Sequence, residues 1–295
     1  MDPRDGMTTP ESTPVVHAPA DAGQEAVDQA NAEFWNELCG TGLAKHLGIT
    51  SHEPASLRRF DDYYLALYPY LLERVPVRTM AGRRVLEIGL GYGTLGQQIA
   101  AHGAVYTGLD IAEGPVRMMN HRLRMLGAEG HAQQGNMLQC PLPDASVDCV
   151  VSIGCFHHTG DAQRCIDESF RVLAPGGRAY VMVYNQFSYR RWLAWPGPTL
   201  RALLRELGGS SAREAASDAE RRAYDADGAG RSAPETEFFS VRDVRRMFSR
   251  FSNVRVQKEN CDPLIRHGRV VISREALLPY LGRLAGLDLY IEATK

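Results

Sequence analysis

The 295-residue sequence predicts an α/β fold in which a mostly parallel, doubly wound sheet carries a helical cap. Between residues 84 and 184, short apolar runs alternate with helical stretches, which is the pattern of βαβ units. The first run leads into three glycines at alternate positions, and an acidic residue ends the second run; these residues are Gly89, Gly91, Gly93 and Asp110. A glycine loop and a carboxylate in these places indicate a nucleoside-binding crevice at the carboxyl edge of the sheet.

The N-terminal part of the chain predicts a tail followed by helices. Residues 1–29 are rich in Pro, Thr, Ala and acidic side chains, which is typical of a flexible tail. Residues 30–80 predict an N-terminal helical cap, because apolar side chains recur there at helical spacing. The side chains that share one face are Phe60, Tyr64, Leu67 and Leu71. Pro69 must bend this helix or split it after Leu67.

The core elements are expected in a regular order. The predicted strands are 84–88, 105–109, 131–134, 147–153 and 178–184, and the helices between them are 94–102, 114–126 and 162–173. The alternation stops at residues 186–240, which hold two tryptophans, a helical stretch at 201–223 and a glycine-rich loop. The chain then resumes with a helix at 241–248, a strand at 253–259, a helix near 275–285 and a strand at 287–293. We therefore expect a core at 81–185, a substrate-covering insertion at 186–240, and a C-terminal part of the same sheet at 241–295.

Composition excludes several classes of protein. A net charge of −2 gives no general attraction to nucleic acid or to an anionic membrane. The six cysteines form no C-x-x-C and no metal-finger spacing, so we expect reduced thiols, a cytoplasmic location and no metal site. No run approaches the roughly 18 apolar residues of a spanning helix, and the N-terminus lacks the apolar core of a signal peptide.

The glycine loop favours S-adenosylmethionine (SAM) over NAD. Its spacing is G-x-G-x-G, whereas a dinucleotide site typically has G-x-G-x-x-G. Glu87 stands two residues before the first glycine, where a carboxylate would repel a pyrophosphate but tolerate a cationic amine or a sulfonium. Asp110 ends the second strand and could accept both ribose hydroxyls in either case.

Five motifs follow one another between residues 83 and 184: E-I-G-L-G-Y-G, G-L-D-I, Q-G-N-M, P-L-P-D-A-S-V-D-C-V-V-S-I-G and R-V-L-A-P-G-G. In this order and spacing they resemble the class I SAM-dependent methyltransferase family. The resemblance implies a Rossmann-like, seven-stranded sheet with six parallel strands and an antiparallel last strand. It also implies cofactor contacts from Glu87, Gly89, Gly91, Gly93, Asp110, Ile111, Asn136, Met137, Ser152 and Gly154.

The family pattern gives each of these positions a role. Glu87 and the first two glycines would line the methionine half of SAM, together with backbone groups at 152–154. Asp110 would hold the ribose, and Ile111 would pack on the adenine. Asn136, with Met137, would face the adenine amino edge. The family often has Asp at that position, so we expect weaker discrimination there.

Residues that could act on the acceptor follow the fourth and fifth strands. His157 and His158 come after the fourth strand, and either could deprotonate a hydroxyl at neutral pH, or could instead orient the loop. Tyr184 and Asn185 end the fifth strand and would contact the acceptor or pack at the strand end. Cys155 is expected to be a small buried side chain.

Flanking residues leave further alternatives open. Four tyrosines, at positions 63, 64, 68 and 70, are mostly core side chains, one of which could cover the cofactor. Glu235 and Glu237 could recognise a cationic acceptor or lead into the helix that Ser240 begins. Trp192 and Trp195 could floor an apolar pocket or anchor the insertion.

The sequence thus predicts a SAM-dependent methyltransferase that acts on O, N or C of a small organic molecule, as in secondary-metabolite biosynthesis. We expect a monomer or homodimer that binds no nucleic acid and no membrane. Two other classes remain open, namely a SAM-binding protein without catalysis and an NAD-dependent oxidoreductase.

Overall fold

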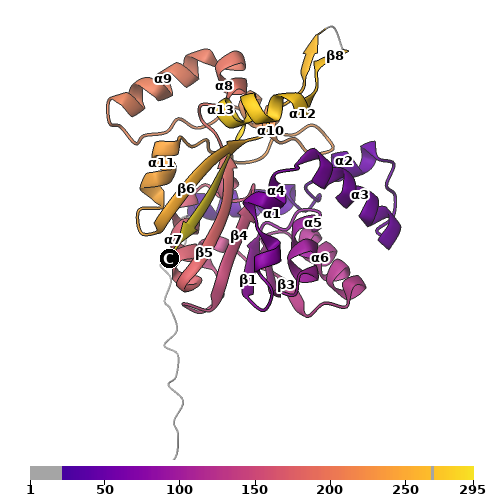
Figure 1. The fold of residues 1–295 in the computed structure, drawn as a ribbon. Coiled ribbons are helices and arrows are strands. Elements are labelled where there is room, and N and C mark those ends of the chain that lie inside the picture. The colour runs from indigo at the N-terminus through magenta and orange to yellow at the C-terminus, as the bar shows by residue number, and fades with distance from the viewer. Residues whose placement is uncertain (1–21, 267–268) are drawn as a thin grey trace, which may run out of the picture.

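A seven-stranded sheet forms the centre of the computed structural model, which describes residues 22–266 and 269–295 (Figure 1). Its strand order is β3-β2-β1-β4-β5-β9-β6. The bounds are β1 Arg84–Ile88, β2 Val105–Asp110, β3 Gly130–Gln134, β4 Val147–Ile153, β5 Leu173–Tyr184, β6 Ser252–Glu259 and β9 Asp288–Thr294. Strands β1 to β5 pair in parallel, whereas β9 runs antiparallel to both β5 and β6. The predicted seven-stranded sheet with one antiparallel last strand is therefore confirmed.

Helices cover both faces of the sheet. Successive side chains of β1 point to opposite faces, so each face presents its own apolar side chains to the helices that cover it. Val85 packs in the apolar cluster that contains side chains of α5 (Thr94–Ala101) and α6 (Glu113–Leu126). Leu86 packs in the cluster of α7 (Ala162–Val172) and α11 (Val241–Met247). Two buried apolar layers follow from this alternation, as expected for a doubly wound sheet.

Strand β5 begins earlier than the predicted residue 178. Val147 pairs with Leu173 and Cys149 pairs with Arg178, so the intervening residues of β5 form a bulge. Gly176 has φ 76° in this bulge, a backbone angle that glycine adopts readily.

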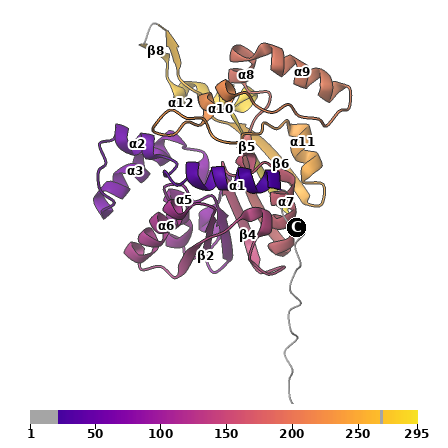
Figure 2. The ribbon, with the colours of Figure 1, turned by 180° about the vertical axis from the view of Figure 1, so that it is seen from behind.

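The N-terminal helices are α1 (Ala22–Phe34), α2 (Thr41–His46), α3 (Pro54–Leu67) and α4 (Leu71–Arg74), followed by the 3₁₀ turn η1 (Val77–Thr79). The predicted split after Leu67 is confirmed. The predicted tail was wrong for residues 22–29, which begin α1, and its residues 1–21 lie outside the described part of the chain. Figure 2 shows α1 lying across the sheet. Hydrogen bonds to a distant loop hold α1, as described below, and local composition could not reveal them.

The insertion contains α8 (Tyr189–Ala194), α9 (Pro196–Leu207) and α10 (Asp218–Tyr224). A single helix over 201–223 was wrong, because residues 208–217 are not helical. Glycines at 208 and 209 favour an end to α9, and a capping box between Ser217 and Glu220 starts α10.

The remaining elements complete the C-terminal part. They are the 3₁₀ turns η2 (Met137–Gln139) and η3 (Phe156–His158), the hairpin strands β7 (Leu264–Arg266) and β8 (Arg269–Ile272), and the helical run α12 (Arg274–Leu277), η4 (Leu278–Gly282) and α13 (Arg283–Ala285). The β7–β8 hairpin was not predicted. Within the described residues, no helix is long and apolar enough to cross a membrane.

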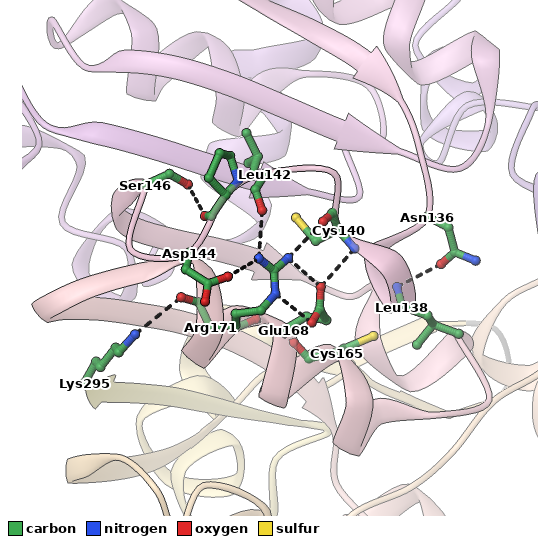
Figure 3. A network of polar contacts seen from close by, with 12 residues as sticks. Asn136, Leu138, Cys140, Leu142, Asp144, Ser146, Cys165, Glu168, Arg171 and Lys295 are labelled. Carbon is green, nitrogen blue, oxygen red and sulfur yellow. Dashed lines mark hydrogen bonds and ion pairs between the residues drawn. The ribbon is translucent and has the colours of Figure 1, made fainter. Parts of the chain in front are cut away.

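An ion-pair network fixes the connection from β3 to β4 (Figure 3). Arg171 of α7 donates to the carbonyl oxygens of Cys140 and Leu142, each at 2.9 Å, and pairs with Glu168 and Asp144, each at 2.7 Å. Glu168 in turn accepts the backbone N–H of Cys140 at 3.1 Å. The network holds the segment that begins at Asn136, one of the predicted cofactor residues.

Candidate active site

The loop after β1 has the conformation that its glycines predict. Gly89, Gly91 and Gly93 have φ angles of 77°, 51° and 80°, in the left-handed region where a Cβ is unfavourable. A Cβ at Gly89 would lie 2.6 Å from Cβ of Cys155, and one at Gly93 would lie 2.7 Å from Cδ of Arg122. The loop therefore needs glycine both for its backbone angles and for close contact with the rest of the chain.

Asp110 lies at the carboxyl end of β2, beside this loop. One carboxylate oxygen accepts the N–H of Leu90 at 2.8 Å, and the other accepts the N–H of Ala112 at 2.9 Å. Burial raises the pKa of Asp110 to about 6, although these backbone donors favour the charged form. A carboxylate oxygen can accept more than one hydrogen bond, so each retains capacity for a ribose hydroxyl. Asp110 thus fits the predicted nucleoside contact.

Glu87 supports the loop from the side of α5. It is 3% exposed, and the hydroxyl of Tyr106 donates to its Oε2 at 2.5 Å. A Cβ on Gly96 would lie 2.4 Å from the same oxygen. Burial raises the pKa of Glu87 to about 8, so the carboxyl is mostly neutral at pH 7 without a ligand. A neutral Glu87 would repel a pyrophosphate less than the sequence indicated.

Helix α1 supplies a carboxylate next to Asn136. The side-chain amide of Asn136 donates to Oδ2 of Asp28 at 2.6 Å, and its oxygen accepts the N–H of Leu138 at 2.9 Å (Figure 3 shows the latter). Asp28 also accepts a hydrogen bond from Gln24 at 2.8 Å. Both functional groups of Asn136 are thus already bonded, and the nearby Asp28 could not be identified from any motif. The neighbouring Met137 is buried.

The end of β4 and the turn η3 lie over the glycine loop. Ser152 is fully buried, Gly154 has φ 82°, and Cys155 contacts the loop at Gly89, as noted above. Ile111, after β2, is half-buried. Cys155, expected to be buried, is half-buried, and protein around its thiol raises the pKa to about 12, which disfavours a reactive thiolate.

The two histidines of η3 have different surroundings. His157 is fully buried, its ring nitrogens have no hydrogen-bond partner, and burial keeps its pKa well below the usual range. Nδ1 of His158 donates to the carbonyl oxygen of Glu235 at 2.7 Å, because a carbonyl oxygen can only accept, so Nδ1 carries a proton. Its Nε2 lies 3.4 Å from Oδ2 of Asp225. His158, rather than His157, therefore has a polar partner suited to proton transfer.

Tyr184 joins His158 at Asp225. The Tyr184 hydroxyl donates to Oδ2 of Asp225 at 2.9 Å, the oxygen nearest His158. The ring of Tyr184 packs on that of His157 with centroids 4.0 Å apart. The structure thus brings all three predicted catalytic residues together, and adds Asp225 from the insertion, which the sequence analysis did not select.

Other residues singled out in the sequence have partners outside this group. Asn185 donates to the carbonyl oxygen of Gly286 at 2.7 Å, and Glu237 pairs with Arg213 at 2.8 Å. Trp195 lines a pocket inside the insertion. Ser240 forms the expected capping box at the start of α11.

Cys39 completes the surroundings of the loop. Cys39 has exposed surface, yet neighbouring protein displaces water around its thiol and raises the pKa to about 12, with Asp225 and Asp110 adding to the effect. Backbone and side-chain atoms of Cys39 face Gly91. No group of three or more His, Cys, Asp or Glu in the described residues could hold a metal ion.

Comparison with known proteins identifies the domain. Residues 86–181 match a family model described as a methyltransferase domain. A probable SAM-dependent methyltransferase of Mycolicibacterium smegmatis is 34% identical over 129 residues, 44% of this chain and 48% of that protein. The 27-O-demethylrifamycin SV methyltransferase of Amycolatopsis mediterranei is 32% identical over 152 residues, 50% of this chain and 53% of that protein.

The chain spans about half the length of these curated relatives. Others carry different names, among them a demethylmenaquinone methyltransferase of Tropheryma whipplei and a ribosomal RNA small subunit methyltransferase C of Chromohalobacter salexigens. The shared region therefore identifies the core and leaves the acceptor open.

Solved structures agree on the fold. Magnesium protoporphyrin IX methyltransferase from Synechocystis PCC 6803, with bound S-adenosylhomocysteine (SAH), has a TM-score of 0.51 at 15% identity, over 91% of this chain and 99% of that one. The strand order, the motifs and the family match lead to one conclusion: residues 86–181 form a methyltransferase domain, in a sheet with the fold of the class I SAM-dependent methyltransferases, a family that uses SAM as cofactor.

Proposed function

We propose that the protein transfers a methyl group from SAM to a small organic acceptor, bound between the glycine loop and the two flanking segments. One observation carries the proposal, namely that the insertion places Asp225 against His158 and Tyr184 at the carboxyl edge of the sheet. These groups do not bond Asp110 or the glycine loop, so they are available to a second substrate. In this proposal the 30–80 helices and the 186–240 insertion are the substrate cap.

The chain has residues suited to hold the cofactor. Asp110 keeps hydrogen-bonding capacity for two hydroxyls, and the loop at Gly89 and Gly91 lets the backbone approach a ligand. SAM supplies an electrophilic methyl group when bound. Because its leaving group is already good, the protein contributes mainly proximity and alignment.

Proton removal is the remaining chemical task when the acceptor carries a proton. His158 is oriented by Glu235 through Nδ1, which leaves Nε2 on the side of Asp225. The Tyr184 hydroxyl fixes the Asp225 carboxylate by donating to Oδ2, the oxygen nearest Nε2 of His158. We assign the general base to this His158–Asp225 pair, with Tyr184 as a positioning residue.

A small molecule is favoured over RNA as acceptor. The net charge of −2 provides no electrostatic attraction to phosphates, and the proposed site lies under the insertion. The six cysteines are free thiols, which supports a cytoplasmic location. A role in secondary-metabolite biosynthesis is consistent with the rifamycin relative, and the protein would act as a monomer or homodimer.

The test is calorimetric titration of SAH into the purified protein, with NAD as control ligand and Asp110→Asn as control variant. Micromolar SAH binding, no NAD response and weakened SAH binding in the variant are expected. An acceptor screen then measures SAH release from SAM. NAD binding without SAH binding would refute the proposal. SAH binding without turnover of any small molecule or ribosomal RNA would favour a non-catalytic SAM-binding protein.

A further inference from the structure

A buried carboxylate without a complete set of partners lies next to the proposed acceptor site. Asp288 is the first residue of β9 and pairs in register with Tyr184 of β5, so both side chains lie on the same face at the same edge of the sheet. Asp288 is 2% exposed. Asn260 donates to its Oδ2 at 2.9 Å, but Oδ1 is buried and has no hydrogen-bond partner. Such an oxygen is costly unless a ligand satisfies it.

Four tyrosine side chains lie within reach of the charge of this carboxylate. The rings of Tyr64 and Tyr68 are 4.9 Å apart, and those of Tyr184 and Tyr224 are 4.8 Å apart. All four are only partly buried. We call these four residues the tyrosine wall.

The charges of Asp288 and Asp225 raise the pKa of hydroxyl groups in the tyrosine wall. Burial raises the pKa of Tyr68 to about 12, and the charge of Asp288 contributes to the rise. For Tyr64 and Tyr184 the pKa is also raised, first by burial and then by charges that include Asp288. Asp225 acts on Tyr68 and Tyr184 in the same direction.

The nearest cationic side chains are bonded elsewhere. Arg274 donates to Oδ1 of Asn260 at 2.8 Å and to the carbonyl oxygen of Leu67. Arg190 pairs with Asp262 at 2.7 Å. In the described parts of the chain, neither Asp288 nor Asp225 forms an ion pair with an Arg or Lys side chain. Burial raises the pKa of Asp288 to about 7, and Asp225 adds to that rise, as expected for a carboxyl without a direct cationic partner.

We infer that the acceptor is a small cationic amine, whose ammonium group binds between Asp288 and Asp225 against the tyrosine wall. The inference rests on the proposed function and names its substrate class. Carboxylates provide the charge-assisted hydrogen bonds, and tyrosine rings attract a cation through their faces. An uncharged acceptor would leave Oδ1 of Asp288 without equivalent compensation.

The chemistry of an amine balances with these groups. One ammonium proton passes to the general base assigned above, the His158–Asp225 pair, and leaves a neutral amine that Oδ1 of Asp288 still holds. Its lone pair forms the new nitrogen–carbon bond as the sulfonium sulfur–carbon bond breaks, and sulfur keeps that electron pair. Nitrogen acquires the positive charge that sulfur loses, and the methylated ammonium product forms beside SAH.

Matched ligands test the charge of the acceptor directly. Binding of 2-phenylethylamine, tyramine and putrescine is measured by calorimetry in the presence of SAH, with 2-phenylethanol as the uncharged counterpart of the first. The amines are expected to bind, and 2-phenylethanol at least about tenfold more weakly than 2-phenylethylamine, because a buried charged hydrogen bond is lost. Equal binding of the alcohol, or no binding of any amine to the SAH complex, would overturn the inference.

Variants then test which carboxylates bind the ammonium group. Asp288→Asn should weaken amine binding about tenfold or more and leave SAH affinity within about twofold. Asp225→Asn, in the insertion, should also weaken amine binding. It provides the test of the inference if the Asp288 variant does not fold. The control is Asp167→Asn, an exposed residue of α7 that lies 3.5 Å from Arg250. Variants that bind the amine like the wild type would contradict the inference.

Failure of the two proposals can be told apart. Absence of SAH binding would refute the proposed function, and amine binding measured without SAH would still report on Asp288. SAH binding combined with alcohol-selective binding would keep the proposed function and refute the amine acceptor.

Discussion

Replacing Asp61 should destabilise the protein strongly, because it is the sole anionic partner of a fully buried arginine among the ion pairs of the described residues. Arg122 of α6 is 0% exposed and donates to both carboxylate oxygens of Asp61, at 2.8 Å and 3.0 Å. Thr94 and Gln97 of α5 donate to the same carboxylate, at 2.6 Å and 3.2 Å. Asp61 thereby joins α3 to the helix that follows the glycine loop.

The magnitude follows from the burial of the pair. Asp61→Asn keeps the volume but leaves the guanidinium charge of Arg122 uncompensated in the interior. Breaking a buried ion pair in this way costs about 3–5 kcal/mol of unfolding free energy. Urea denaturation followed by circular dichroism measures this loss. The neighbouring exposed Asp62→Asn is the matched control and should stay within about 0.5 kcal/mol of the wild type.

A double variant distinguishes loss of charge balance from loss of packing. Asp61→Leu combined with Arg122→Met removes both charges and keeps apolar volume, so it should recover much of the stability lost in Asp61→Asn. Asp61 does not compensate the buried charge of Arg122 as stated if Asp61→Asn costs less than about 1 kcal/mol. The same conclusion follows if the double variant is less stable than the single one.

Three further predictions concern the loop and the histidines. Folding raises the pKa of Glu87 from 4.5 to about 8, so between these pH values the folded chain holds a proton that the unfolded chain has released. The ligand-free protein should therefore lose stability as pH rises through this range. Urea denaturation at several pH values measures this loss, which should be smaller in Glu87→Gln. Gly89→Ala should abolish SAH binding by calorimetry, whereas Gly82→Ala, with a similar φ of 69° and no atom within 4 Å, should retain it. His157→Phe should keep methyl-transfer activity and His158→Gln should lose it by about 10²-fold or more, as measured by SAH release; equal losses would contradict the assignment of the base.

The sequence predicted the core because its strands are determined locally. Apolar runs bounded by turns marked β1 and β4 at the residues where the structure has them, and α6 ends at the predicted residue 126, before Gly127 with φ 63°. The β7–β8 hairpin could not be found in this way, since strands of three and four residues are too short for alternation to be recognised.

The site could be predicted only where one motif contains it. Asp110 and the glycine loop lie close together in sequence, and the structure also brings them together. Asp225 and Asp288 follow no motif, and their place beside Tyr184 depends on the path of the insertion and on strand register. Pairings between distant segments of this kind are not encoded in any local pattern.

One short loop links the proposed cofactor and acceptor sides. Two side chains of helix α1 donate hydrogen bonds to this loop, each at 2.7 Å. Gln24 donates to the carbonyl oxygen of Thr159, and Asn31 donates to the carbonyl oxygen of His158. The insertion binds the same loop, because the N–H of Glu237 donates to the carbonyl oxygen of His157 at 2.7 Å. These are neutral hydrogen bonds to backbone rather than surface ion pairs, so salt should screen them little. The η3 loop therefore holds both flanking segments in place over the carboxyl edge, and a change in either segment should reach His158 through its backbone.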